Sequence, residues 1–130
     1  MPRKNNAFTL VEIMIVVVII ALLAAIAIPN LLRSRNQAQE ATAQANLKLI
    51  ANALENYAAI NSQYPTVTST LMGVTPPYLS VDYFSGAING YTFTHSLASY
   101  SYLISAYPAN TGTSLASYSI TTGGVLTINP

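Results

Sequence analysis

The carboxyl group with the most unusual surroundings in this sequence is that of Glu12. It lies near the start of "AFTLVEIMIVVVIIALLAAIAIP", residues 7–29, a run that is otherwise almost entirely apolar. A carboxylate inside hydrocarbon is costly and usually has a partner and a role. The run contains no Lys, Arg or His to pair with Glu12. An α-amino group, created by cutting the chain just before Phe8, would supply the missing positive charge from the same chain or from a neighbouring copy.

The other titratable side chains are too few to form a catalytic or metal site. His95 is the only histidine, there is no cysteine, and Asp82 is the only acid after residue 55. A histidine metal site needs several ligands, and a calcium site usually takes more than one carboxylate. We therefore predict a protein that is not an enzyme and has no cofactor and no bound metal. We expect His95 to lie at a strand end, as a surface or hydrogen-bonded residue.

The positive charges are also few, and the formal net charge is only +1. Arg3 and Lys4 precede the apolar run, Arg33 and Arg35 follow it, and Lys48 comes later. Phosphate backbones are bound by clusters of Lys and Arg, so we predict no nucleic-acid partner. The equal charges on the two flanks of the run leave its membrane orientation undecided by the positive-inside rule.

The apolar run itself has three interpretations. Residues 10–28 would form a helix about 28 Å long, close to the thickness of a bilayer's hydrocarbon core. The run could be a plain membrane anchor. It could be a secretory signal with Arg3 and Lys4 as its basic region, cut after Ala27. The third interpretation gives Glu12 the amine of Phe8 as a partner.

The quoted stretch, continued to residue 30, resembles the N-terminus of type IV pilins and type II secretion pseudopilins. This resemblance implies that residues 1–7 are a leader, removed by a prepilin peptidase that cuts between Ala7 and Phe8. It further implies that Phe8 is N-methylated, that Glu12 neutralises the terminal amine of an adjacent subunit, and that Pro29 bends the helix. Ala7 departs from the family pattern, which usually has Gly before the cut.

The resemblance also implies the partners and the location. The precursor would cross the inner (cytoplasmic) membrane once, with its leader in the cytoplasm. An inner-membrane assembly platform would then polymerise it into a homo-oligomeric helical filament, a cell-surface pilus or a periplasmic pseudopilus. We predict a type IV pilus subunit, because the acidic calcium loop common in major pseudopilins is missing. A pseudopilin is the first alternative, and a secreted or membrane-anchored binding module is the second.

The sequence after residue 29 predicts that the helix continues. Residues 30–61 contain no Gly or Pro and are rich in helix formers, so one helix from Leu10 to about Asn61 is expected. Pro29 removes a backbone donor, and a kink or local unwinding is expected at residues 25–28. The second half carries one apolar stripe, formed by Ala43, Leu47, Ile50, Leu54 and Tyr57.

Residues 62–130 have a different composition and predict a long loop followed by a small antiparallel sheet. The expected strands alternate apolar and polar residues and cover 91–95, 100–106, 117–121 and 125–128. Gly123-Gly124 predicts a hairpin turn, and Tyr100 is expected on the apolar face with Tyr102 and Ile104. The predicted fold is α+β: a long N-terminal helix, with a membrane half at 8–29 and an amphipathic half at 30–61, packed on three or four strands.

Overall fold

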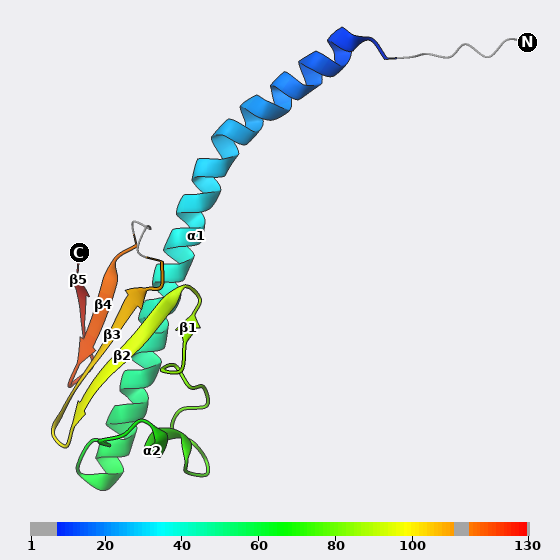
Figure 1. The fold of residues 1–130 in the computed structure, drawn as a ribbon. Coiled ribbons are helices and arrows are strands. Elements are labelled where there is room, and N and C mark those ends of the chain that lie inside the picture. The colour runs from blue at the N-terminus through cyan, green and yellow to red at the C-terminus, as the bar shows by residue number, and fades with distance from the viewer. Residues whose placement is uncertain (1–7, 111–114, 130) are drawn as a thin grey trace, which may run out of the picture. The chain divides into compact units, whose positions relative to one another are not determined.

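A computed structural model describes residues 8–110 and 115–129 of the chain. The chain divides into two compact units, Met1–Arg35 and Asn36–Pro130. The first unit contains the apolar half of the long helix. The second contains the rest of that helix together with the sheet and the segment that connects them (Figure 1).

The long helix α1 runs from Leu10 to Asn61, as the sequence predicts. Pro29 lies inside it, and the residues before Pro29 are helical, so the local unwinding expected at residues 25–28 is not present. A kink at Pro29 stays a prediction. The helix ends where Ser62 adopts a left-handed conformation, with φ of 62°, and donates its N–H to the carbonyl of Ala58 at 2.8 Å.

The sheet of the second unit has five antiparallel strands, each paired with the next along the chain. The strands are β1 (Ala87–Ile88), β2 (Tyr91–Ala98), β3 (Ser101–Pro108), β4 (Ser117–Thr121) and β5 (Val125–Asn129). The sequence predicts the last four and misses β1, because two residues are too few to show an alternating pattern. Gly123 and Gly124 form the predicted turn between β4 and β5, with φ of 81° and 73°.

The core of this unit lies between α1 and one face of the sheet. The helix stripe is buried as predicted, except that Tyr57 is only half-buried. The sheet contributes Tyr91, Phe93, Tyr102, Ile104, Ala106, Tyr118 and Ile120. The expectation for Tyr100 is wrong: it lies in the turn before β3 and its side chain is 75% exposed.

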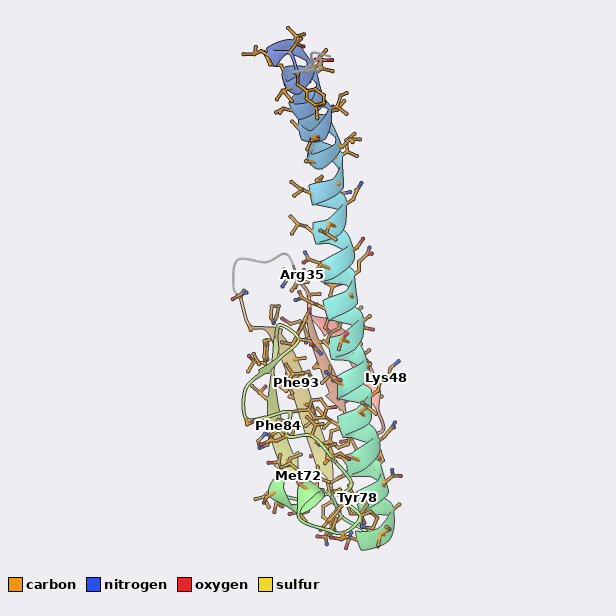
Figure 2. All side chains as sticks on the ribbon, turned by 90° about the vertical axis from the view of Figure 1, so that its right-hand side faces the viewer. Arg35, Lys48, Met72, Tyr78, Phe84 and Phe93 are labelled. Atoms are coloured by element: carbon orange, nitrogen blue, oxygen red, sulfur yellow. The ribbon has the colours of Figure 1, made fainter. Side chains whose placement is uncertain are left out.

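The segment between α1 and the sheet is more regular than the sequence suggests. It contains a short helix, α2 (Ser69–Met72), in which Leu71 is buried. The carbonyl of Leu71 accepts the N–H groups of Tyr78 and Leu79 at 2.9 and 3.1 Å. In this segment the Tyr78 ring contacts Tyr57 of α1, and the Tyr83 ring contacts Phe93 of β2, with ring centres 5.6 and 5.7 Å apart. Figure 2 labels Tyr78 beside α1 and Phe93 on the sheet. The segment therefore closes one side of the core.

Candidate assembly site

The start of α1 is a capping box formed by Thr9 and Glu12. The Thr9 N–H and hydroxyl donate to Oε2 of Glu12 at 2.8 and 2.7 Å, and the Glu12 N–H donates to the Thr9 hydroxyl oxygen at 3.2 Å. The two side chains thus satisfy donors that the first turn of a helix leaves unpaired. The Thr-x-x-Glu spacing is the sequence signal of this contact, although the apolar run draws attention to Glu12 alone.

These hydrogen bonds give the Glu12 carboxyl group an orientation, so a partner need not supply it. Thr9 orients the carboxylate, and the helix N-terminus adds partial positive charge. Both donors are neutral, however, so Thr9 supplies no positive charge to pair with the carboxylate. All of its hydrogen bonds with the described residues use Oε2. The arrangement therefore orients the Glu12 carboxyl group, four residues after Phe8.

Two of the other predicted site residues lie in the described part of the chain. The Phe8 side chain is 81% exposed. Pro29 lies within α1. Ala7 and the other residues of the predicted leader lie outside the described residues, so of the predicted cleavage site the structure describes only Phe8.

The apolar half of α1 is exposed among the described residues. Nearly all of its large side chains are more than half exposed, from Leu10 at 75% to Ile28 at 58%. By its length and composition, α1 is the one helix among the described residues that could cross a membrane. Exposed apolar surface of this extent is typical of a surface that contacts a membrane or another protein.

The second unit contains a polar cluster centred on Glu55, whose carboxylate is half-buried. Its oxygens accept the hydroxyl of Tyr64 at 3.0–3.1 Å, the hydroxyl of Tyr102 at 3.0 Å and the N–H of Gly123 at 2.9 Å. The Tyr102 hydroxyl oxygen in turn accepts the N–H of Gly124 at 3.2 Å. The cluster joins α1 to the connecting segment, to β3 and to the turn between β4 and β5.

This environment affects the tyrosines. Burial, together with the hydrogen bond to the Glu55 carboxylate, raises the pKa of Tyr64 and of Tyr102. The sequence places Glu55 outside the apolar stripe of the helix. It could not indicate the cluster, because the partners are nine to 68 positions away along the chain.

A second polar contact fixes the residues before β4. The Ala116 N–H donates to Oε1 of Glu40 at 3.2 Å, and the Tyr91 hydroxyl donates to the Ala116 carbonyl at 2.9 Å. Burial, and to a lesser degree the nearby Glu40 charge, raises the pKa of Tyr91 to about 12. Glu40 and Glu55 therefore hold two different parts of the sheet to α1.

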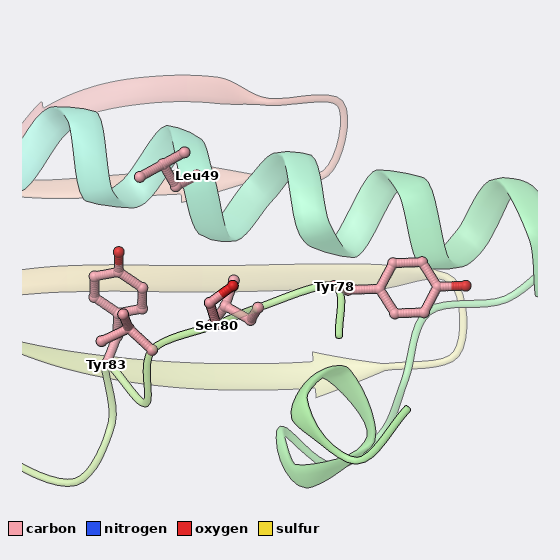
Figure 3. Close-up of a pocket in the computed structure, with 6 residues that line it drawn as sticks. Leu49, Tyr78, Ser80 and Tyr83 are labelled. Carbon is pink, nitrogen blue, oxygen red and sulfur yellow. The ribbon is translucent and has the colours of Figure 1, made fainter. Parts of the chain in front are cut away.

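No described part of the second unit brings together groups suited to catalysis. A hollow of about 190 Å³ lies between Leu49 of α1 and the connecting segment, where Tyr78, Ser80 and Tyr83 line it (Figure 3). Its lining residues contain no acid, base or thiol apart from tyrosine hydroxyls. No group of three His, Cys, Asp or Glu able to hold a metal occurs among the described residues.

His95 takes a different position from the one predicted. It lies within β2 rather than at a strand end, because β2 continues to Ala98. Its exposed ring contacts Phe84 edge to face, with ring centres 4.7 Å apart. His95 therefore packs against Phe84.

Comparison with known proteins identifies the first unit's motif. Residues 2–28 match the family model described as the prokaryotic N-terminal methylation motif. The chain carries the methylation motif of pilins and pseudopilins. This match covers residues 2–7 of the predicted leader, Phe8, the Thr9–Glu12 capping box and the apolar run as far as Ile28.

Individual relatives extend the similarity. A type II secretion system core protein G of Vibrio cholerae is 42% identical over 76 residues, 58% of this chain and 52% of that protein. The Escherichia coli K12 core protein G is 37% identical over 84 residues, which are 62% of this chain and 58% of that protein. The type IV major pilin protein PilA of Myxococcus xanthus is 41% identical over 61 residues, which are 47% of this chain and 28% of that protein. The chain thus spans just over half the length of the two secretion proteins.

These relatives confirm the predicted family and the prediction of a structural, non-enzymatic protein. They favour the alternative over the main prediction within the family. Most of the relatives found are type II secretion core proteins rather than pilins. The missing acidic calcium loop, on which the preference for a pilin rested, is therefore not a sufficient criterion.

Proposed function

We propose that this chain is a pseudopilin-type subunit, made as an inner-membrane precursor and assembled into a periplasmic filament of a type II secretion system. The observation that supports this most strongly is the similarity to core protein G across more than half of the chain. The uncovered apolar half of α1 supports the assembly step, because a filament core would replace the lipid that surrounds the precursor.

In this proposal a prepilin peptidase cuts between Ala7 and Phe8 and the new terminus is N-methylated. The Phe8 amine of one subunit then neutralises Glu12 of an adjacent subunit. The capping box supports this role, because Thr9 already holds the carboxylate in one orientation before a partner arrives. Preorganisation of this kind lowers the entropy lost when the contact forms.

The globular unit has a separate role in the proposal. The Glu55 cluster and the Glu40 contact join α1 to the sheet with hydrogen bonds alone. We propose that these contacts hold α1 to the sheet without the help of a bound metal ion. Removal of divalent cations with a chelator is accordingly expected to leave its unfolding midpoint unchanged.

A type IV pilus subunit is the second candidate, supported by the similarity to PilA. Deletion of the gene distinguishes the two. The proposed function predicts that exoproteins accumulate in the periplasm while surface pili remain, with secretion restored by the wild-type gene as the control. Loss of surface pili with normal secretion would support the pilus subunit instead.

A further inference from the structure

Two arginines, Arg33 and Arg35, follow the apolar half of α1 and have no acidic partner within helical reach. Ion pairs along a helix form between residues three or four positions apart. Those positions are occupied by Pro29, Asn30, Leu31, Leu32, Asn36, Gln37, Ala38 and Gln39, none of which is acidic. The next acid along the helix, Glu40, accepts the Ala116 N–H. Both arginines are exposed, and each has a positive charge for which the helix supplies no counterion.

The spacing along α1 places these charges at a membrane surface. At about 1.5 Å per residue, Arg33 and Arg35 lie about 7 and 10 Å beyond Ile28, the end of the apolar run. The polar layer on each side of a bilayer is about 5–7 Å thick. When the run fills the hydrocarbon core, the Arg33 backbone is therefore at the outer edge of the headgroup layer, and the Arg35 backbone is about 3 Å beyond it.

The direction of helical side chains brings the charges closer to the lipid. Side chains on an α-helix tilt toward its N-terminus. For Arg33 and Arg35 that direction is toward the membrane, and long basic side chains extend along it to place their charge at the interface. Leu31 and Leu32, 70% and 54% exposed, supply further apolar surface at this level.

We propose that Arg33 and Arg35 bind the phosphate groups of anionic lipids, in the leaflet on the side opposite to the leader. The guanidinium group suits this ligand, because its planar donors can bind two phosphate oxygens at once. The proposal rests on the proposed function, since it requires the membrane-inserted chain.

The consequence is a fixed depth of the subunit in the membrane. Loss of the leader removes Arg3 and Lys4, after which Arg33 and Arg35 are the side-chain cations nearest the apolar run. A basic residue near an anionic membrane surface strengthens binding about fivefold, and salt weakens the effect. Anionic lipid therefore holds the mature subunit in register with the bilayer until it is assembled.

A spin label between the two arginines tests the proposal. The chain has no cysteine, so Ser34→Cys provides a single labelling site on the full-length protein. The labelled protein is reconstituted into vesicles of phosphatidylcholine alone and into vesicles that also contain phosphatidylglycerol. We expect a less mobile label in the anionic vesicles, a difference that high salt reduces. The Arg33→Gln/Arg35→Gln variant should lose the difference, and the matched control Lys48→Gln should keep it.

Other outcomes contradict the proposal. Equal label mobility in the two kinds of vesicle would overturn it, as would a lipid effect that survives in the double Gln variant. If the label becomes less mobile when the protein concentration rises, and not when phosphatidylglycerol is added, the arginines bind acidic groups of neighbouring copies. That result would overturn the proposal. Release of the chain from all vesicles by carbonate would mean that it does not insert. That last result would contradict the proposed function as well, whereas the others concern the arginines alone.

Discussion

The hydroxyl of Thr9 lies 2.7 Å from Oε2 of Glu12 and donates a hydrogen bond to it. This contact joins the residue after the proposed new N-terminus to the one acid of the apolar run. The acid is thus held by its own chain before any neighbour is present. In the proposed assembly, this held carboxylate is the group that registers one subunit against the next.

Replacing Glu12 with Ala should block filament assembly and leave membrane insertion intact. The substitution removes the anion that pairs with the Phe8 amine but adds no charge to the apolar run. Electron microscopy of filaments measures assembly, and resistance to carbonate extraction measures insertion. Glu12→Gln is the matched variant, because it keeps a hydrogen-bond acceptor for Thr9 without the charge. Normal filaments from Glu12→Gln would show that charge neutralisation is not required.

Thr9→Val should reduce assembly less than Glu12→Ala. Valine keeps the shape and the backbone N–H but loses the hydroxyl that both donates to and accepts from Glu12. Loss of a helix cap of this kind corresponds to about a fivefold change in the population of the ordered first turn. Filament yield per cell measures the effect. Thr9→Ser restores the hydroxyl and should restore the yield; a serine variant as defective as the valine variant would contradict this role.

Glu55→Ala should destabilise the globular unit by about 2–3 kcal/mol, because it removes the charged acceptor of several hydrogen bonds. The hydroxyl of Tyr102 and the N–H of Gly123 lose their shared partner. Urea unfolding of the full chain in detergent, followed by tyrosine near-UV circular dichroism, gives the value. Asn52→Ala, an exposed position on the same helix, is the control and should change stability little. Equal stability of the two variants would rule out a structural role for the cluster.

High pH should destabilise the globular unit. The pKa of Tyr91 is raised from 10.0 to about 12 in the folded chain, and those of Tyr64 and Tyr102 are also raised. The folded state therefore retains these protons at pH values where the unfolded state releases them. By linkage, this contribution to stability is complete below pH 10 and is lost as the pH rises toward 12.

The urea midpoint in detergent should fall as the pH rises from about 9 to about 11.5, across the range in which these tyrosines titrate. Tyr91→Phe should show a smaller fall, because it lacks one of the raised groups. Tyr100→Phe is the control, since the Tyr100 side chain is largely exposed and its substitution should leave the pH dependence as it is. A midpoint independent of pH over this range would contradict the assignment.

Much of the fold could be predicted because its signals are local. The long helix follows from residue propensity, and its buried stripe follows from the spacing of Ala43, Leu47, Ile50 and Leu54. The prediction for Tyr100 is wrong because alternation continues into a turn, and only pairing shows that β3 begins at Ser101. The helix α2 depends on the contacts that bury Leu71, which short-range patterns do not reveal.

The candidate assembly site and the Glu55 cluster could be predicted only in part. Glu12 stands out because a charge in an apolar run is visible in any reading of the sequence. Thr9 was missed although its spacing from Glu12 is that of a capping box. Glu55 could not be distinguished from other polar helix residues, because its importance comes from Tyr102 and Gly123 of distant strands and turns.

The central claim is that the mature chain begins at Phe8, whose amine provides the partner of Glu12. Mass spectrometry of the N-terminal peptide of the protein purified from membranes tests it most directly. We expect a peptide that starts at N-methylated Phe8. A mature chain that starts at Ile28, after cleavage at Ala27, or one that keeps Met1 and the whole leader, would contradict the claim.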